Sequence, residues 1–116
     1  MRTIKFRGKS LADGSWLYGD LLQEEGKVHI YNGKRGPYYT VDPDTVGQFA
    51  GWQDKTGKDI YENDIVKRGK YIGTVIYAAP SFHLDTGYWA PLRLVGNCTV
   101  IGNTTDNPDL LKGDKS

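Results

Sequence analysis

The sequence predicts an all-β fold, with an N-terminal β-meander followed by a small C-terminal barrel. Glycine occurs 15 times in 116 residues, beside many Val, Ile, Thr and Tyr residues, a composition that favours short strands and tight turns. Candidate strands recur at intervals of roughly eight to twelve residues, which is typical of small barrels and sandwiches. A chain of this length buries about two-thirds of its unfolded surface. We therefore expect one domain or two small subdomains.

The first half of the chain predicts the meander. Residues 4–7 alternate apolar and basic side chains, the period of a half-buried strand. Asp13-Gly14 favours a hairpin turn, and Pro43 ends a strand because proline lacks an N–H donor. After this strand, the sequence allows a single helical turn at residues 43–46. The strands predicted here cover residues 4–9, 16–22, 28–31 and 38–41.

The second half predicts the barrel. Thr56-Gly57 marks a turn before the first barrel strand. A longer loop is expected through Pro80 and Phe82, and a helical turn at 107–111 with Asn107 as its cap. We expect residues 112–116 to be a disordered tail. The strands predicted here cover residues 64–68, 71–78, 92–95 and 97–102.

Charge and cysteine content narrow the classes of function. The chain has 15 basic and 14 acidic residues, a formal charge of +1, so no global field attracts nucleic acid or a membrane. Cys98 is the only cysteine, which excludes an internal disulfide and a thiolate zinc site and suits a reducing cytosol. No apolar run approaches the roughly 20 residues of a membrane helix. These features predict a cytoplasmic protein in which Cys98 is buried and inert.

Six motifs, in order, run through nearly the whole chain and together resemble the YopX family, small proteins encoded by phages and prophages. They are IKFRGK (4–9), WLYGDL (16–21), VDPDTVGQF (41–49), DKTGKDIYENDIV (54–66), GTVIY (73–77), and VIGN (100–103) with NPDLL (107–111). The resemblance implies an SH3-like barrel towards the C-terminus and a phage gene product acting inside a bacterial host cell. It implies no assigned biochemical function. The expected domains are then a meander at 1–51 and an SH3-like barrel at 52–111.

Four acids crowd the central motif. Asp54, Asp59, Glu62 and Asp64 lie within eleven residues, and close carboxylates can bind a hard cation or act as acid and base. Their spacing does not match the calcium loop. Turn formation explains Asp54, and side-chain bonds to the backbone suit Asp64 at the entry to a strand. We therefore predict structural roles for the acids, with no metal, no cofactor and no catalytic residue.

Two basic segments beside tyrosines are the strongest functional signal. Basic loops hold phosphates while neighbouring rings stack on bases, and small barrels commonly serve as the platform. The alternative is that the cations solvate turns and protect edge strands, and the neutral total charge favours this alternative. The nucleic-acid candidates are Lys34, Arg35, Tyr38, Lys67, Arg68 and Lys70.

The tryptophans and histidines are further candidates for ligand sites. Large rings are first needed for the core of so small a protein, so we expect Trp16 and Trp52 to be buried. Trp89, with Tyr88, is expected to be partly exposed and to anchor a protein contact. His29 and His83 are in no metal-binding motif, and His29 is expected to be an ordinary strand residue.

The leading hypothesis is a non-catalytic phage accessory protein that binds another protein or copies of itself. Small β modules often bury exposed edges and rings by oligomerising. The alternative is a module that binds single-stranded nucleic acid through its basic loops. An enzyme that uses the acids of the central motif is the weakest of the three hypotheses.

Overall fold

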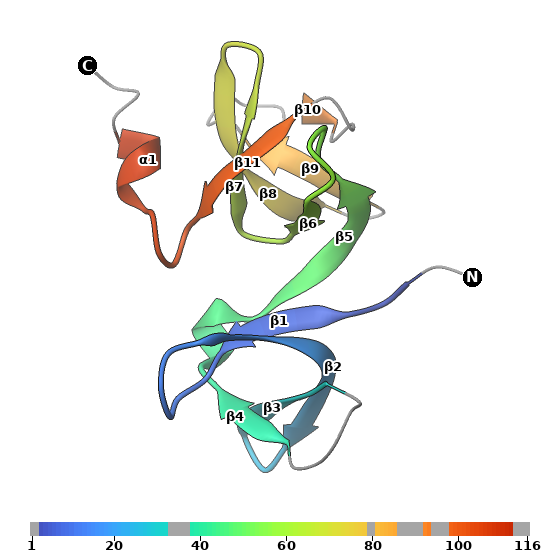
Figure 1. The fold of residues 1–116 in the computed structure, drawn as a ribbon, viewed down its shortest axis with the longest axis vertical. Coiled ribbons are helices and arrows are strands. Elements are labelled where there is room, and N and C mark those ends of the chain that lie inside the picture. The colour runs from blue at the N-terminus through green and yellow to red at the C-terminus, as the bar shows by residue number, and fades with distance from the viewer. Residues whose placement is uncertain (1–2, 33–37, 79–80, 86–91, 94–97, 113–116) are drawn as a thin grey trace. The chain divides into compact units, whose positions relative to one another are not determined.

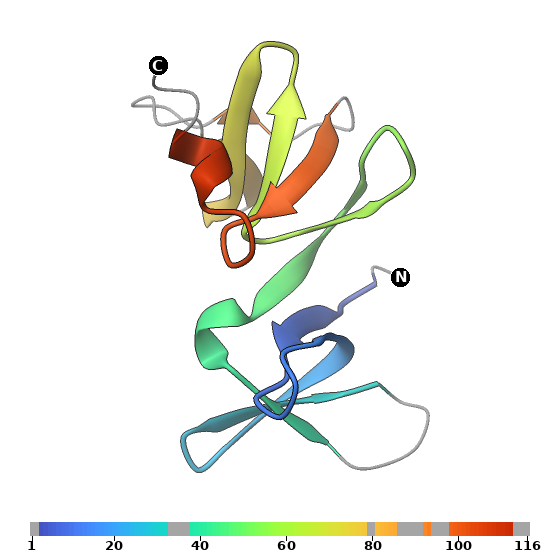
Figure 2. The ribbon, with the colours of Figure 1, turned by 60° about the vertical axis from the view of Figure 1, so that its left-hand side comes forward.

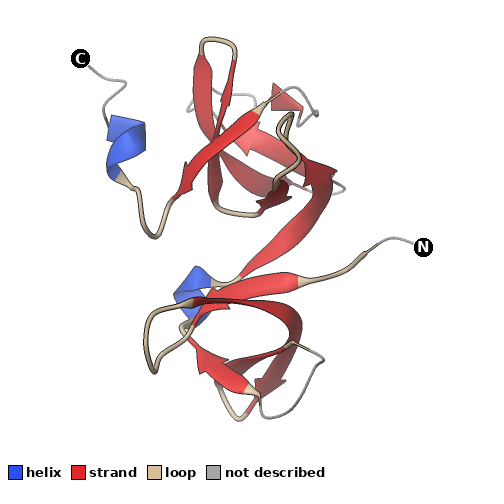
Figure 3. Ribbon diagram, viewed as in Figure 1, coloured by secondary structure: helices blue, strands red, loops and turns tan. Residues whose placement is uncertain are grey.

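The computed structural model describes residues 3–32, 38–78, 81–85, 92–93 and 98–112. Strands dominate it, as Figure 3 shows, and the all-β prediction is confirmed. The strands are β1 (Phe6–Lys9), β2 (Trp16–Glu24), β3 (Lys27–Tyr31), β4 (Tyr39–Val41), β5 (Gly47–Gln53), β6 (Asp59–Tyr61), β7 (Asp64–Arg68), β8 (Tyr71–Ala78), β9 (Ser81–Asp85), β10 (Leu92–Arg93) and β11 (Thr99–Asn103). The helical segments are a 3-10 turn, η1 (Pro43–Thr45), and α1 (Asp109–Lys112).

The chain divides into two compact units, Met1–Phe49 and Ala50–Ser116. Strand β5 continues from the first unit into the second (Figure 1). The strands form two antiparallel sheets, with the orders β4-β3-β2-β1-β5-β6 and β10-β9-β8-β7-β11. The division predicted from the sequence, 1–51 and 52–111, stays a prediction.

Two hairpins build the N-terminal unit. Strands β1 and β2 pair antiparallel around the Asp13-Gly14 turn, with Lys9 opposite Trp16. A two-residue loop, Glu25-Gly26, joins β2 to β3, and both residues have positive φ. Positive φ at both positions is the type I′ geometry that matches the twist of paired strands. Ile30 and Val41 are the buried apolar side chains on the inner face of this sheet.

The sheet of this unit curls until β4 returns to the end of β1. The Leu11 N–H donates to the Thr40 carbonyl at 3.0 Å, and the Asp42 N–H donates to the Lys9 carbonyl at 2.9 Å. Gly8 lies under Val41, and a Cβ there would come within 2.9 Å of the valine Cγ2. The outer edge of β4 is therefore occupied by its own chain.

The core of the C-terminal unit is formed by apolar side chains from five strands and the segment that precedes β11. Its buried members are Ala50, Ile60, Val66, Val75, Leu84 and Cys98, with Phe82 and Val100 packed against them. The burial predicted for Cys98 is confirmed. Figure 2 shows α1 at the end of the loop that follows β11, and Leu110 of α1 lies next to Gly102 of β11.

Two predictions about this unit are wrong, and strands β5 and β6 were missed. The loop expected through Phe82 is strand β9, which pairs with β8 and places Leu84 opposite Val75 in the core. Strand β6 was missed because three residues are too few to show the alternation of apolar and polar side chains that marks a strand. Trp52 is 53% exposed, not buried. Gly51, at a φ of 91°, interrupts the alternation that would have placed Trp52 with the buried Ala50.

Strands β7 to β11 of the C-terminal unit form an antiparallel sheet with β10 and β11 at its ends, whereas β6 pairs with β5 in the other sheet. The SH3-like barrel predicted for residues 52–111 stays a prediction.

Candidate binding surfaces

The carboxylate of Asp54 closes the turn of the central motif and bonds to β11. Asp54 is buried, and its Oδ1 accepts hydrogen bonds from the Thr56 N–H (2.8 Å), the Thr56 hydroxyl (2.6 Å) and the Lys58 N–H (3.0 Å). Its Oδ2 accepts from the Val100 N–H of β11 at 2.9 Å. The turn formation predicted for Asp54 is confirmed, and the same carboxylate also covers the outer edge of β11.

These bonds determine the ionisation of Asp54. Burial alone would raise its pKa, but the hydrogen bonds from Thr56, Val100 and Lys58 lower the pKa well below its ordinary value of 3.8. Asp54 is therefore a carboxylate across the physiological pH range. These partners are all donors that favour the charged form, so Asp54 is poorly suited to act as a general acid.

Two other acids of this motif accept hydrogen bonds from neighbouring residues. The Tyr61 N–H donates to Asp64 Oδ2 at 2.7 Å, which confirms the side-chain bond to the backbone predicted for Asp64. Asp59 accepts a hydrogen bond from the Gln53 amide at 3.1 Å. Within the described ranges, no three His, Cys, Asp or Glu side chains are grouped as metal ligands.

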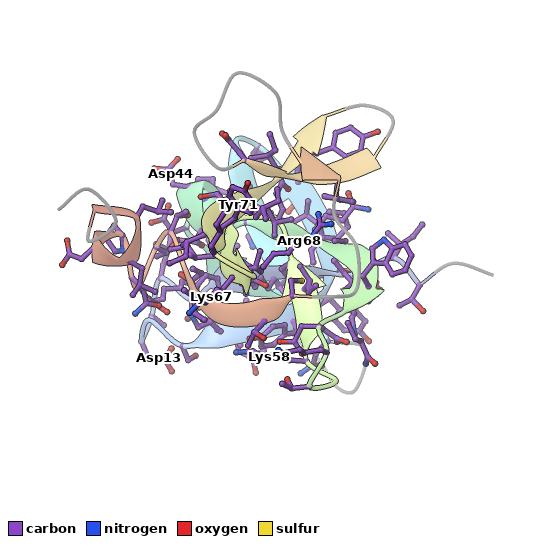
Figure 4. The ribbon with its side chains drawn as sticks, turned by 90° about the horizontal axis from the view of Figure 1, so that it is seen from above. Asp13, Asp44, Lys58, Lys67, Arg68 and Tyr71 are labelled. Atoms are coloured by element: carbon purple, nitrogen blue, oxygen red, sulfur yellow. The ribbon has the colours of Figure 1, made fainter. Side chains whose placement is uncertain are left out.

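The β7–β8 hairpin carries the described cations among the nucleic-acid candidates. Arg68 pairs with Tyr71 across the hairpin, and Lys70 Nζ lies 5.6 Å from the centre of the Tyr71 ring. Figure 4, viewed from above, labels Lys67, Arg68 and Tyr71 on this hairpin. Lys67 precedes Arg68 in the strand, so their side chains point to opposite faces. The hairpin therefore brings Arg68, Lys70 and Tyr71 together, but not Lys67.

Tyr38 belongs to an aromatic cluster of the N-terminal unit. Its ring, in a residue 50% exposed, lies 5.0 Å from the Tyr31 ring and 6.4 Å from the His29 ring. His29 is a cross-strand residue, as predicted, with its Nδ1 3.0 Å from the Thr40 hydroxyl. Lys34 and Arg35, the predicted cationic partners of Tyr38, lie outside the described residues.

The end of the β8–β9 hairpin presents an exposed ring. Tyr77 is 54% exposed and meets Phe82 edge to face, with ring centres 5.1 Å apart. Phe82 packs against the core in turn, so the Tyr77 ring rests on a fixed support. The predicted protein-contact residues, Tyr88 and Trp89, follow β9 in the sequence and lie outside the described residues.

A further surface was missed by the sequence analysis. On β1 and its neighbours, Lys5 Nζ lies 4.7 Å from the centre of the Phe49 ring. The Arg7 guanidinium and Lys9 Nζ lie 4.7 Å and 5.5 Å from the Trp16 ring. The signal was present in the sequence, because residues 5, 7 and 9 share one face of the predicted strand. Only the strand register shows which rings they meet.

No helix in the described part of the chain is long and apolar enough to cross a membrane.

The fold and these surfaces define a small all-β protein of two compact units, with aromatic and basic side chains on its strands. A family model described as YopX protein matches residues 5–112. The chain therefore belongs to the YopX family, as its motifs predicted.

The fold also resembles a solved structure. The crystal structure of protein EF1440 from Enterococcus faecalis matches with a TM-score of 0.60, covering 96% of this chain and 99% of that chain. The sequences are 21% identical, so this likeness concerns the fold alone. No curated protein matches the chain in sequence.

Proposed function

We propose that this protein is a non-catalytic β module that binds another protein, and that the Tyr77 ring of the β8–β9 hairpin is its described contact. The exposed, supported Tyr77 ring is the observation that carries the proposal. Membership of the YopX family supports a role as a phage or prophage accessory protein inside a bacterial cell.

The Tyr77 ring has the properties of an interface anchor. Tyrosine is enriched among the residues that dominate binding energy, because it offers a large contact area with few rotatable bonds. An edge-to-face pair holds the ring before any partner arrives. Little conformational entropy is then lost on binding, which favours affinity.

Pairing of open strand edges is a less favourable route to assembly. The outer side of β4 is bonded to residues 9–11, and Asp54 accepts the Val100 N–H of β11. The Lys55 N–H also donates to the Cys98 carbonyl at 3.0 Å. Covered edges resist the addition of a further strand, so we propose contact through side chains, in a complex with a partner protein or with a second copy.

The test is affinity capture from infected bacterial cells, with and without nuclease, using the wild type, Tyr77→Ser and the matched control Tyr39→Ser. Tyr39 is also exposed, at 44%, but belongs to the other unit. A protein retained after nuclease by the wild type and the control, and lost with Tyr77→Ser, supports the proposal. Equal retention by all three forms overturns it. Light scattering decides whether the partner is a second copy.

Binding of single-stranded nucleic acid is the second candidate function. It is favoured by the placement of Arg68, Lys70 and Tyr71 on one hairpin, where cations and a ring are adjacent. Phosphates would contact the cations while a base stacks on the ring. Oligonucleotide binding by the wild type is the expected result, and a loss of binding in Arg68→Glu/Lys70→Glu would assign it to this hairpin.

The fold proposed for residues 52–111 is the SH3-like barrel that the family resemblance implies. Its closure requires contacts that bring the strands at the two ends of the β10-β9-β8-β7-β11 sheet together. Nuclear Overhauser effects between these end strands would support a closed barrel. Their absence, with the other cross-strand effects present, would leave an open sheet.

A further inference from the structure

One face of the N-terminal unit gathers cations and aromatic rings. Side chains directly opposite each other in an antiparallel pair share a face. Arg7 is opposite Tyr18, Lys9 is opposite Trp16, and the Phe49 N–H donates to the Lys5 carbonyl at 2.8 Å. We call this set the cation–aromatic face. Its members are Lys5, Arg7, Lys9, Trp16, Tyr18 and Phe49.

The face is the outer side of the sheet. Alternation places Phe6, Gly8 and Leu17 on the opposite side. Gly8 lies against the buried Val41 on that side. The face therefore points away from the buried Val41, and Arg7 is the one member of the face that is itself buried.

Charge is segregated in this unit, although the whole chain is almost neutral. Three of its cations are on the cation–aromatic face, whereas its acids are mostly elsewhere. Asp13 is in the first turn, and Asp42 and Asp44 flank the start of η1. On the outward side of β2, alternation places Asp20 and Glu24, and Glu24 is opposite Lys27 at the far end of the hairpin. Arg7 is buried and Asp20 follows Tyr18 on the same side, so the accessible positive charge of the face comes from Lys5 and Lys9.

The side chains of the face divide into two roles. Arg7 is 6% exposed and its guanidinium lies over the Trp16 ring, so it positions that ring. Lys5 and Lys9 are only half-buried, and each is held near a ring. Tyr18 is 47% exposed and offers a ring to a ligand. Cations fixed beside an exposed ring suit a ligand that repeats a negative charge and a flat, unpaired base.

We propose that the cation–aromatic face binds single-stranded nucleic acid, with Lys5 and Lys9 contacting phosphates and Tyr18 stacking on a base. This inference rests on the second candidate function and locates the binding on the N-terminal unit instead of the β7–β8 hairpin. Each lysine that neutralises a phosphate contributes to the salt dependence of binding, with a slope of about 0.7 per contact on a single strand.

The test is fluorescence anisotropy of a labelled oligothymidylate titrated with protein at low and increasing salt. The variants are Lys5→Glu/Lys9→Glu and Tyr18→Ala, compared with Arg68→Glu/Lys70→Glu on the hairpin. Lys27→Glu/Lys58→Glu is the matched control, because it makes the same change in net charge at two exposed lysines elsewhere. Thermal unfolding confirms that each variant is folded.

The expected result is a loss of about tenfold or more in affinity for Lys5→Glu/Lys9→Glu, with a salt slope reduced by about 1.4 for two contacts. Tyr18→Ala weakens binding about tenfold through lost stacking, while the control and the hairpin variant bind as the wild type does.

Four outcomes overturn the inference in different ways. A wild type that does not bind at low salt removes both the inference and the second candidate function. Loss of binding in the hairpin variant alone removes the inference and leaves that function standing. Equal weakening in the lysine control means that binding depends on the net charge of the protein and not on this face. Competition by polyglutamate as effective as by unlabelled oligonucleotide means that the face recognises negative charge and not a base.

Discussion

At the scale of single residues, Asp54 shows how one side chain organises its surroundings. Its carboxylate accepts four hydrogen bonds, from Thr56, Lys58 and Val100. The first two residues close the turn, whereas Val100 belongs to a strand 46 positions further along the chain. The turn is visible in the sequence because Asp followed by Thr-Gly is a common turn pattern. The bond to β11 is not visible, since no local pattern encodes a contact of that separation.

We expect Asp54→Asn to lower the free energy of unfolding by about 1–3 kcal/mol, because bonds to a charged acceptor in a buried site are among the stronger ones. The amide replaces one acceptor oxygen by a donor, so at least one N–H that faces it loses its partner. Urea unfolding measures the change. Asp13→Asn, in an exposed turn with bonds to Ser15, is the control. An equal loss in both variants would contradict the role of Asp54.

The same variant should change the dependence of stability on pH. The native pKa of Asp54 lies below its ordinary value of 3.8, so its contribution is complete above that value and is lost as the pH falls towards the native pKa. Between pH 7 and about 2, wild-type stability should therefore decline more steeply than that of Asp54→Asn. Parallel curves would show that Asp54 does not titrate with unfolding.

At the scale of the elements, local patterns located most hairpins and missed three strands, β5, β6 and β9. The β7 and β8 strands were predicted with their observed bounds, because residues 64–68 and 71–78 flank a glycine turn. Strand β9 was assigned to a loop because Pro80 suggested a break. Its place is decided by pairing with β8, where Leu84 is buried opposite Val75.

Gly73 of β8 lies against the backbone at the end of β9. A Cβ at this glycine would lie 2.5 Å from the Asp85 carbonyl oxygen, which is backbone and cannot rotate away. We expect Gly73→Ala to lower the free energy of unfolding by about 1–3 kcal/mol through overpacking. Thr74→Ala, the next residue in the same strand, is the comparison, because it introduces alanine into β8 without adding atoms. An unchanged free energy of unfolding in Gly73→Ala would mean that β9 can shift away from the added methyl group without loss of stability.

At the scale of the whole molecule, the division at Phe49 and Ala50 raises the question of independent opening. The buried cluster that contains Val75 and Leu84 lies entirely within the second unit. We expect Gly73→Ala to accelerate amide hydrogen exchange in strands β7 to β9 while β1 to β3 keep their protection, because units with separate cores open separately. Uniformly faster exchange would instead show one cooperative unit.

The sequence by itself determined the all-β class, the membership of the YopX family and most hairpins, because alternation and turn residues act over a few neighbouring positions. It also identified Tyr38, Arg68 and Lys70 as candidates, but not how they are grouped. Lys67 and Arg68 were assigned to one site although adjacent strand residues face opposite ways.

Only the tertiary structure decided which side chains meet. It placed Arg7 and Lys9 around Trp16, left Trp52 exposed, and brought Asp54 to the edge of β11. The physical reason is that strand register and curl join residues far apart in the chain. A shift of one residue in register would turn every side chain of a strand to the other face.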